Sequence, residues 1–152
     1  MDAGRYFEWV PGLEQEGLSL PTRQTDGAAG YDLFARGDVA IAPGEIALVP
    51  TGVRVRLPAS EFLAVFARSS LAIKRRLVLA NGVGVVDADY YGNPDNGGEI
   101  MVSLWNIGQA EVLLTRGERI AQGVFMQYLV SAADADLPLG KTRSGGFGST
   151  GR

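Results

Sequence analysis

Short apolar runs separated by turn residues recur along this chain, and they constrain its fold more than any other feature. Val53, Val55 and Leu57 alternate with two arginines, which is the pattern of a strand that buries one face. Further strands are expected at residues 46–49, 62–66, 77–80, 83–86, 100–105, 112–114 and 120–128. Turn sequences such as Ala42-Pro43-Gly44 stand between them. Strands at this spacing predict an all-β fold, either a jelly-roll-like sandwich or a barrel.

One segment departs from the strand pattern. Residues 69–76 are expected to form a short helix, with Ser69 or Ser70 as its N-terminal cap. A length of 152 residues, 46% of them hydrophobic, predicts one domain with a single core. We divide the chain into a β domain, residues 1–136, and a glycine-rich C-terminal arm, residues 137–152, which we expect to be flexible.

The chain contains neither cysteine nor histidine. This excludes disulfides and cysteine-bound zinc, and it leaves a carboxylate, a lysine or a tyrosine as the candidate general base. A metal would be held mainly by oxygen, which favours a hard ion such as Mg²⁺ or Ca²⁺. The net charge of −3 argues against a nucleic-acid partner. No apolar run is long enough for a membrane span and no signal peptide is visible, so we expect a cytoplasmic protein without a membrane partner.

The arm combines several groups that can bind a nucleotide. Arg143 offers a bidentate phosphate contact, and the glycines let backbone N–H groups approach an anion. Ser149 and Thr150 add hydroxyls, and Phe147 adds a face on which a base can stack. A frayed, solvated terminus is the simpler interpretation, and the arm alone leaves both open.

Two internal clusters place a charged side chain beside a strand or a helix. Asp32, within residues 29–35, either lies on the polar face of an edge strand or orients water on a metal. The sequence Arg68-Ser69-Ser70 either begins the expected helix with a serine cap or binds phosphate at the helix N-terminus.

Two more clusters lie further along the chain. Asn81 and Gly82 open a glycine-rich stretch that leads to Asp87 and Asp89, which would share one face of a strand. These acids are either a carboxylate base with a supporting acid or the solvated end of a hairpin. Gln122 lies in an apolar strand, as a core amide with satisfied partners or as a ligand donor.

In content and order, the four clusters and the arm resemble the five motifs of the homotrimeric dUTPase family over residues 29–151. The resemblance implies a jelly-roll-like subunit and a homotrimer whose active sites are each assembled from all three chains. It also implies hydrolysis of dUTP to dUMP and pyrophosphate by in-line attack of water on the α-phosphorus, with Mg²⁺ as cofactor. The arm would close over the active site.

The resemblance assigns a role to each matching position. Asp87 would activate the attacking water, and Asp32 would hold a water on the Mg²⁺. The substrate-binding positions are Arg68, Ser69, Ser70, Asn81, Gly82, Val86, Tyr90, Gln122, Arg143, Phe147, Gly148, Ser149 and Thr150. Among them, Asn81 and the backbone of the hairpin at residues 82–86 would read the uracil. Tyr90 would pack beneath the deoxyribose and exclude a 2′-hydroxyl.

The chain departs from the family pattern just after Tyr90. Tyr91 occupies a position that is usually basic, and residues 93–98 intervene before the next strand, which suggests a longer hairpin loop.

Two rival functions and a purely structural jelly roll remain as alternatives, and the last explains the strands but not the clustered polar residues. A dCTP deaminase resembles this family in fold and in an Arg-Ser-Ser segment, but it normally lacks the phenylalanine-bearing arm. A nucleotide-gated protein-binding module on the same fold would use the site to control a partner.

Overall fold

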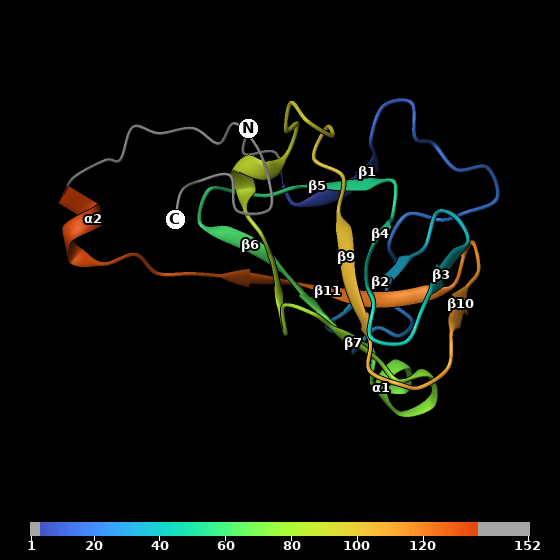
Figure 1. The fold of residues 1–152 in the computed structure, drawn as a ribbon. Helices are drawn as coiled ribbons and strands as arrows, with labels where there is room; N and C mark the ends of the chain where they lie inside the picture. Colours follow the sequence, from blue (N-terminus) through green and yellow to red (C-terminus); the bar gives the residue numbers. More distant parts are fainter. Residues whose placement is uncertain (1–3, 137–152) are drawn as a thin grey trace.

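The computed structural model describes residues 4–136, and strands make up most of its regular structure (Figure 1). The strands are β1 (Tyr6–Trp9), β2 (Tyr31–Phe34), β3 (Val39–Ile41), β4 (Ile46–Pro50), β5 (Val53–Arg56), β6 (Glu61–Phe66), β7 (Leu77–Leu79), β8 (Gly84–Val86), β9 (Met101–Asn106), β10 (Val112–Leu114) and β11 (Arg119–Gln127). The helices are α1 (Ser69–Arg75), the 3₁₀ turn η1 (Ala88–Tyr90) and α2 (Ala132–Asp136). The prediction of an all-β fold with a short helix is confirmed.

The strands form small antiparallel sheets. The largest has the order β2-β11-β6-β8 and the next β4-β9-β7, while β1 pairs with β5 and β3 with β10. Every strand expected after residue 45 is present, with its ends shifted by no more than one residue. Strands β1 and β3 and helix α2 were not predicted. In the part of the chain that the structure describes, no helix is long and apolar enough to cross a membrane.

Helix α1 has no serine cap. Its N-cap residue is Arg68, whose backbone is extended (φ −82°, ψ 136°), and no side chain caps the helix. The prediction that Ser69 or Ser70 provides the cap is therefore wrong. Both serines lie inside the first helical turn, directly after Arg68.

The glycine-rich stretch after β7 crosses between two sheets, so the predicted hairpin is wrong. Strand β7 pairs with β9, whereas β8 pairs with β6, and residues 80–83 carry the chain from one sheet to the other. The turn requires Gly82, because its φ of +73° disfavours other residues. Strand β8 ends its sheet, so among residues 4–136 no strand pairs with its outer edge.

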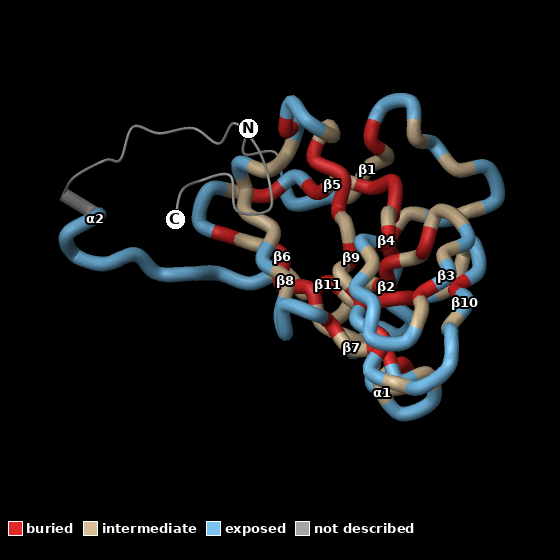
Figure 2. Tube along the Cα trace, viewed as in Figure 1, coloured by how far each residue is buried: buried red, intermediate tan, exposed pale blue. Residues whose placement is uncertain are grey.

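The core lies between the sheets and is built from aliphatic side chains such as Leu33, Val49, Leu104 and Ile120, all fully buried. One part of the chain leaves this core. After β11 the chain runs away from the sheets toward α2, and residues 126–134 are all exposed (Figure 2). Leu129 is 97% exposed.

A polar cluster holds β1 against the segment that follows η1. The Glu8 carboxylate accepts hydrogen bonds from Arg54 Nε, at 2.8 Å, and from the Tyr91 hydroxyl. The Arg54 guanidinium also lies over the Tyr91 ring, 4.3 Å from its centroid. The hydrogen bond from Tyr91 is the main cause of a lowered pKa at Glu8, and the same bond raises the pKa of Tyr91.

We predict that this cluster makes stability depend on pH in the acid range. The pKa of Glu8 in the folded chain lies below its ordinary value of 4.5, so its stabilising contribution is complete above that pH and is lost as the pH falls through the folded pKa. Glu8→Gln should lower the free energy of unfolding in urea at neutral pH, and the difference from the parent should shrink in acid. Glu16→Gln, which removes an exposed carboxylate, is the control. A Glu8→Gln difference that stays constant with pH contradicts the prediction.

Candidate active site

Asp32 and Gln122 face each other across neighbouring strands. Strands β2 and β11 are antiparallel, and their register pairs Asp32 directly with Gln122, so both side chains lie on one face of the sheet. Asp32 is buried, with 7% of its surface exposed. The Gln122 amide donates a hydrogen bond to the Ala67 carbonyl at 3.3 Å, which links this face to the segment that enters α1.

Two arginines flank the Asp32 carboxylate. Arg68 Nε lies 3.7 Å from one carboxylate oxygen, and an Arg119 terminal nitrogen lies 3.4 Å from the other. The Asp32 side chain is 10% exposed, whereas those of Arg68 and Arg119 are 25% and 42% exposed. One carboxylate balances one of the two guanidinium charges, so the group keeps a positive charge that attracts anions.

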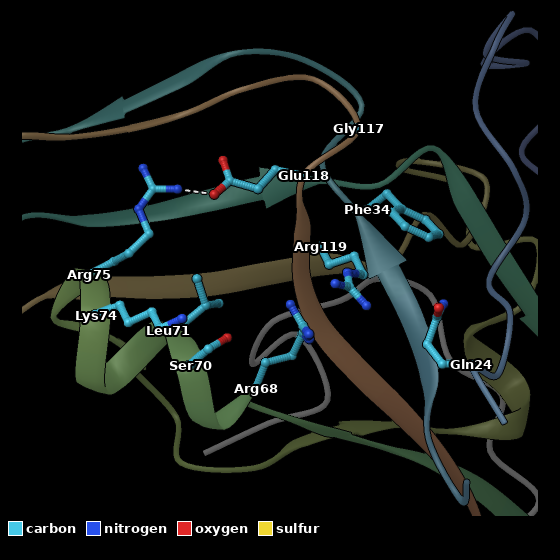
Figure 3. Close-up of a pocket in the computed structure, with 10 residues that line it drawn as sticks. All are labelled: Gln24, Phe34, Arg68, Ser70, Leu71, Lys74, Arg75, Gly117, Glu118 and Arg119. Carbon is cyan, nitrogen blue, oxygen red and sulfur yellow. Dashed lines mark hydrogen bonds and ion pairs between the residues drawn. The ribbon is translucent and has the colours of Figure 1, made fainter.

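A hollow opens beside these groups. It has a volume of about 220 Å³ and is lined by Gln24, Ala28, Gly30, Asp32, Arg68, Ser69, Arg119 and Gln122. A larger hollow of about 590 Å³ shares Gln24, Arg68 and Arg119 with it and adds Ser70, Lys74 and Arg75. In Figure 3, Arg68 and Arg119 point toward this larger hollow from different elements, while Arg75 turns toward Glu118, its ion-pair partner. The two hollows form one basic surface, which we call the basic hollow.

The shape of the basic hollow depends on a glycine. A Cβ atom at Gly30 would lie 2.3 Å from the side-chain oxygen of Gln122 and 3.1 Å from its Cβ and Cδ atoms. No larger residue fits at position 30 unless Gln122 moves. Gly30 therefore allows the Gln122 amide to occupy its place beside Asp32.

A second group of predicted residues surrounds β8. Asn81 is exposed in the turn before it, with its carbonyl accepting a hydrogen bond from the Val83 N–H at 2.8 Å. Asp87 follows Val86 in extended backbone (φ −76°, ψ 156°) and precedes η1. The expectation that Asp87 and Asp89 share a strand face is wrong, because β8 ends at Val86 and Asp89 lies in the 3₁₀ turn. None of these residues lines the basic hollow.

The other predicted residues are Tyr90 and those of the arm. Tyr90 ends η1, is partly buried, and donates a hydrogen bond from its hydroxyl to the Glu99 carbonyl at 3.0 Å. Arg143, Phe147, Gly148, Ser149 and Thr150 lie outside the described residues.

The residues of the basic hollow that were not predicted include Gln24, Gly30 and Arg119. Arg119 stands three positions before Gln122, so regular alternation would put the two on opposite faces of a strand. A register shift between Arg119 and Ala121 places both beside the hollow. Gln24 lies in a loop with no periodic pattern to identify it.

Comparison with known proteins gives concordant matches. The dUTPase family model matches residues 16–151, which include the arm through Gly151. The deoxyuridine 5′-triphosphate nucleotidohydrolase of Lactococcus lactis is 46% identical over 147 residues, 97% of each chain, and that of Desulfotalea psychrophila is 41% identical over 149 residues, 95% of each chain. The crystal structure of the dUTPase from Streptococcus mutans matches with a TM-score of 0.79 at 46% identity, covering 82% of this chain and 97% of that one.

We predict that Gly30→Ala weakens anion binding in the basic hollow, because the new Cβ displaces the Gln122 amide. The affinity for inorganic tripolyphosphate, measured by calorimetry, should fall about tenfold, the effect of losing one hydrogen bond to a charged group. Gly27→Ala is the matched control, since a Cβ at Gly27 meets nothing within 4 Å. Equal affinities of the two variants for tripolyphosphate would show that Gln122 does not contribute to anion binding.

Proposed function

Because the chain belongs to the dUTPase family and hydrolyses dUTP to dUMP and pyrophosphate, we propose that the basic hollow holds the triphosphate of this substrate. The observation that carries the proposal is the pair of partly exposed guanidiniums, Arg68 and Arg119, around one buried carboxylate. The names of the relatives also favour hydrolysis of dUTP over the deamination of dCTP.

Several donors in the basic hollow suit phosphate oxygens. Arg68 and Arg119 can each present two N–H groups to one phosphate. Ser69 and Ser70 follow Arg68 on the first turn of α1 and offer hydroxyls. The Gln122 amide borders the same space. Charged donors in a partly enclosed site bind a multiply charged anion more strongly than the same donors in water.

The donor set fits a Mg²⁺ that arrives with the triphosphate. Within residues 4–136 no group of three acidic side chains is placed to hold a metal ion by itself. Mg²⁺ is commonly bound by substrate phosphates, waters and one or two carboxylates, and Asp32 supplies a carboxylate in the hollow that can hold one of these waters. When bound, the ion neutralises charge on the triphosphate and on the departing pyrophosphate.

The edge of β8 and the turn before it supply groups that can read uracil. The outer edge of β8, an edge strand, presents N–H and C=O groups, and the exposed Asn81 amide adds an NH₂ donor group and a carbonyl acceptor. Cytosine reverses the hydrogen-bond pattern of uracil, and the thymine methyl needs additional room. A mismatch that leaves buried polar groups unpaired discriminates strongly between bases. In this arrangement Tyr90 lies beneath the deoxyribose.

Asp87 is the general base of the proposed reaction. Its carboxylate accepts a proton from a water whose oxygen attacks the α-phosphorus. The new bond to phosphorus forms in line with the bond to pyrophosphate, which breaks. Arg68 and Arg119 offset the negative charge that the leaving pyrophosphate acquires.

We infer that the working protein is a homotrimer with active sites shared between chains. In the described part of one chain, the residues around Asp87 do not line the basic hollow, and a neighbouring chain would bring the two groups together. Two apolar surfaces support this assembly. Ile46 and Trp105 are cross-strand partners on an exposed face of β4 and β9, and residues 128–130 are exposed apolar side chains beyond β11. Exposed apolar side chains grouped in this way are suited to burial against another chain.

The arm completes the site in this proposal. Arg143, Ser149 and Thr150 clamp the outer phosphates, and Phe147 stacks on the uracil beside Gly148. The support is the sequence itself, since the family match extends through the arm. We also propose a cytoplasmic location, because the substrate is a nucleoside triphosphate.

The substrate assignment predicts a clear order of activity. With Mg²⁺ present, pyrophosphate should be released from dUTP, with little release from dTTP, dCTP or UTP. The reason is that the groups at β8 are proposed to select uracil over thymine and cytosine, and that Tyr90 is proposed to exclude the 2′-hydroxyl of UTP. Identification of the products by chromatography checks the reaction as well as the rate, because ammonia release from dCTP would support the deaminase instead. Comparable turnover of all four nucleotides contradicts the assignment.

The assignment of the base predicts that Asp87→Asn reduces turnover of dUTP by roughly 10² to 10⁴, the usual contribution of a general base. The amide keeps the size of the side chain, so affinity for a non-hydrolysable dUTP analogue should be retained. Asp89→Asn in the adjoining 3₁₀ turn is the comparison and should retain most activity. An inactive Asp89→Asn beside an active Asp87→Asn would mean that the wrong acid was assigned.

A further inference from the structure

Residues 93–98 fold back against the end of η1. The Asn93 N–H donates a hydrogen bond to the Tyr90 carbonyl at 3.1 Å. Gly98 (φ +89°) approaches so closely that a Cβ atom there would lie 2.8 Å from the Tyr90 carbonyl oxygen. Asn93 and Gly98 are both buried. The segment is therefore packed against Tyr90. The expected hairpin loop is wrong, because β8 and β9 lie in different sheets.

The Asn96 side chain connects this segment to the phenol of Tyr90. Its Nδ2 donates to the Tyr90 hydroxyl at 2.7 Å, and its Oδ1 accepts from the Gly98 N–H at 3.0 Å. The Tyr90 hydroxyl donates in turn to the Glu99 carbonyl at 3.0 Å. Glu99 is itself buried, and its carboxylate accepts a hydrogen bond from the Gly52 N–H at 2.9 Å. The Tyr90 hydroxyl is thus held between the Asn96 side chain and the Glu99 carbonyl.

We propose that Asn96 is a positioning residue that sets the sugar specificity of this enzyme through Tyr90. The inference rests on the proposed role of Tyr90 beneath the deoxyribose. A ring excludes an added hydroxyl only if the ring cannot move aside, and rotation of Tyr90 would break both hydrogen bonds of its hydroxyl. By holding the ring in place, Asn96 therefore allows Tyr90 to exclude the 2′-hydroxyl of a ribonucleotide.

The readout is the ratio of kcat/KM for UTP to kcat/KM for dUTP. Asn96→Ala should raise this ratio about fivefold, the effect of losing the hydrogen bond from Asn96 to the Tyr90 hydroxyl. Asp95→Ala is the matched control, because Asp95 is an exposed neighbour in the same segment, and it should leave the ratio unchanged. A folded Asn96→Ala protein with the parental ratio overturns the proposal.

Tyr90→Phe keeps the ring and removes the hydroxyl, so it tests the same link from the other side. It should raise the ratio to a similar extent, and adding Asn96→Ala to it should have no further effect. Additive effects would show that Asn96 acts by another route and would overturn the proposal. Where Asn96→Ala does not fold, Tyr90→Phe alone decides, since an unchanged ratio overturns the proposal.

Tyr90→Ala separates this inference from the proposed function. An unchanged ratio in Tyr90→Ala removes Tyr90 from sugar selection, and the inference fails with that role. A raised ratio in Tyr90→Ala together with the parental ratio in Asn96→Ala overturns the positioning role of Asn96 alone.

Discussion

The contact of Asp32 with two arginines, on the face that it shares with Gln122, is the arrangement on which the candidate site depends. Burial of a carboxylate costs free energy unless it is paired. Arg68 and Arg119 supply that pairing at 3.7 and 3.4 Å, from the start of α1 and from β11. Because both guanidiniums stay partly exposed, the charges that stabilise Asp32 also face the hollow. A bound triphosphate would complete the charge balance that the folded chain leaves open.

The fold keeps this basic surface apart from Asp87. The chain crosses from one sheet to another at residues 80–83, and β8 then forms an unpaired edge in the described part of the sheet. Asp87 follows that edge, while Arg68 and Asp32 line the hollow. In the proposed trimer, the exposed apolar residues on β4, on β9 and beyond β11 would contact the other chains. In this account assembly creates the active site as well as stabilising the subunits.

The strands were predictable because each buried face repeats every second residue, a local property of the sequence. The hairpin before β8 was predicted wrongly, because the sequence does not state which strand pairs with which. Arg119 was missed for a related reason: a bulge in β11 changes the face on which its side chain lies. Sequence resemblance grouped Asp32, Arg68 and Gln122, and the structure brings them together. The contact of Asn96 with Tyr90 joins an insertion to a motif residue, and turn propensity alone does not reveal it.

Subunit complementation tests the central claim, that each active site is shared between chains, most directly. Asp87→Asn chains and chains truncated after residue 140 would be unfolded together and reassembled in equal amounts, with mixing verified by native mass spectrometry. Each variant alone should be nearly inactive. If Asp87 and the arm of one site come from different chains, random assembly restores roughly a quarter of the sites, one half for each component. If Asp87 and the arm of one site come from the same chain, no site in a mixed trimer contains both. Activity at background after verified mixing would therefore contradict the account.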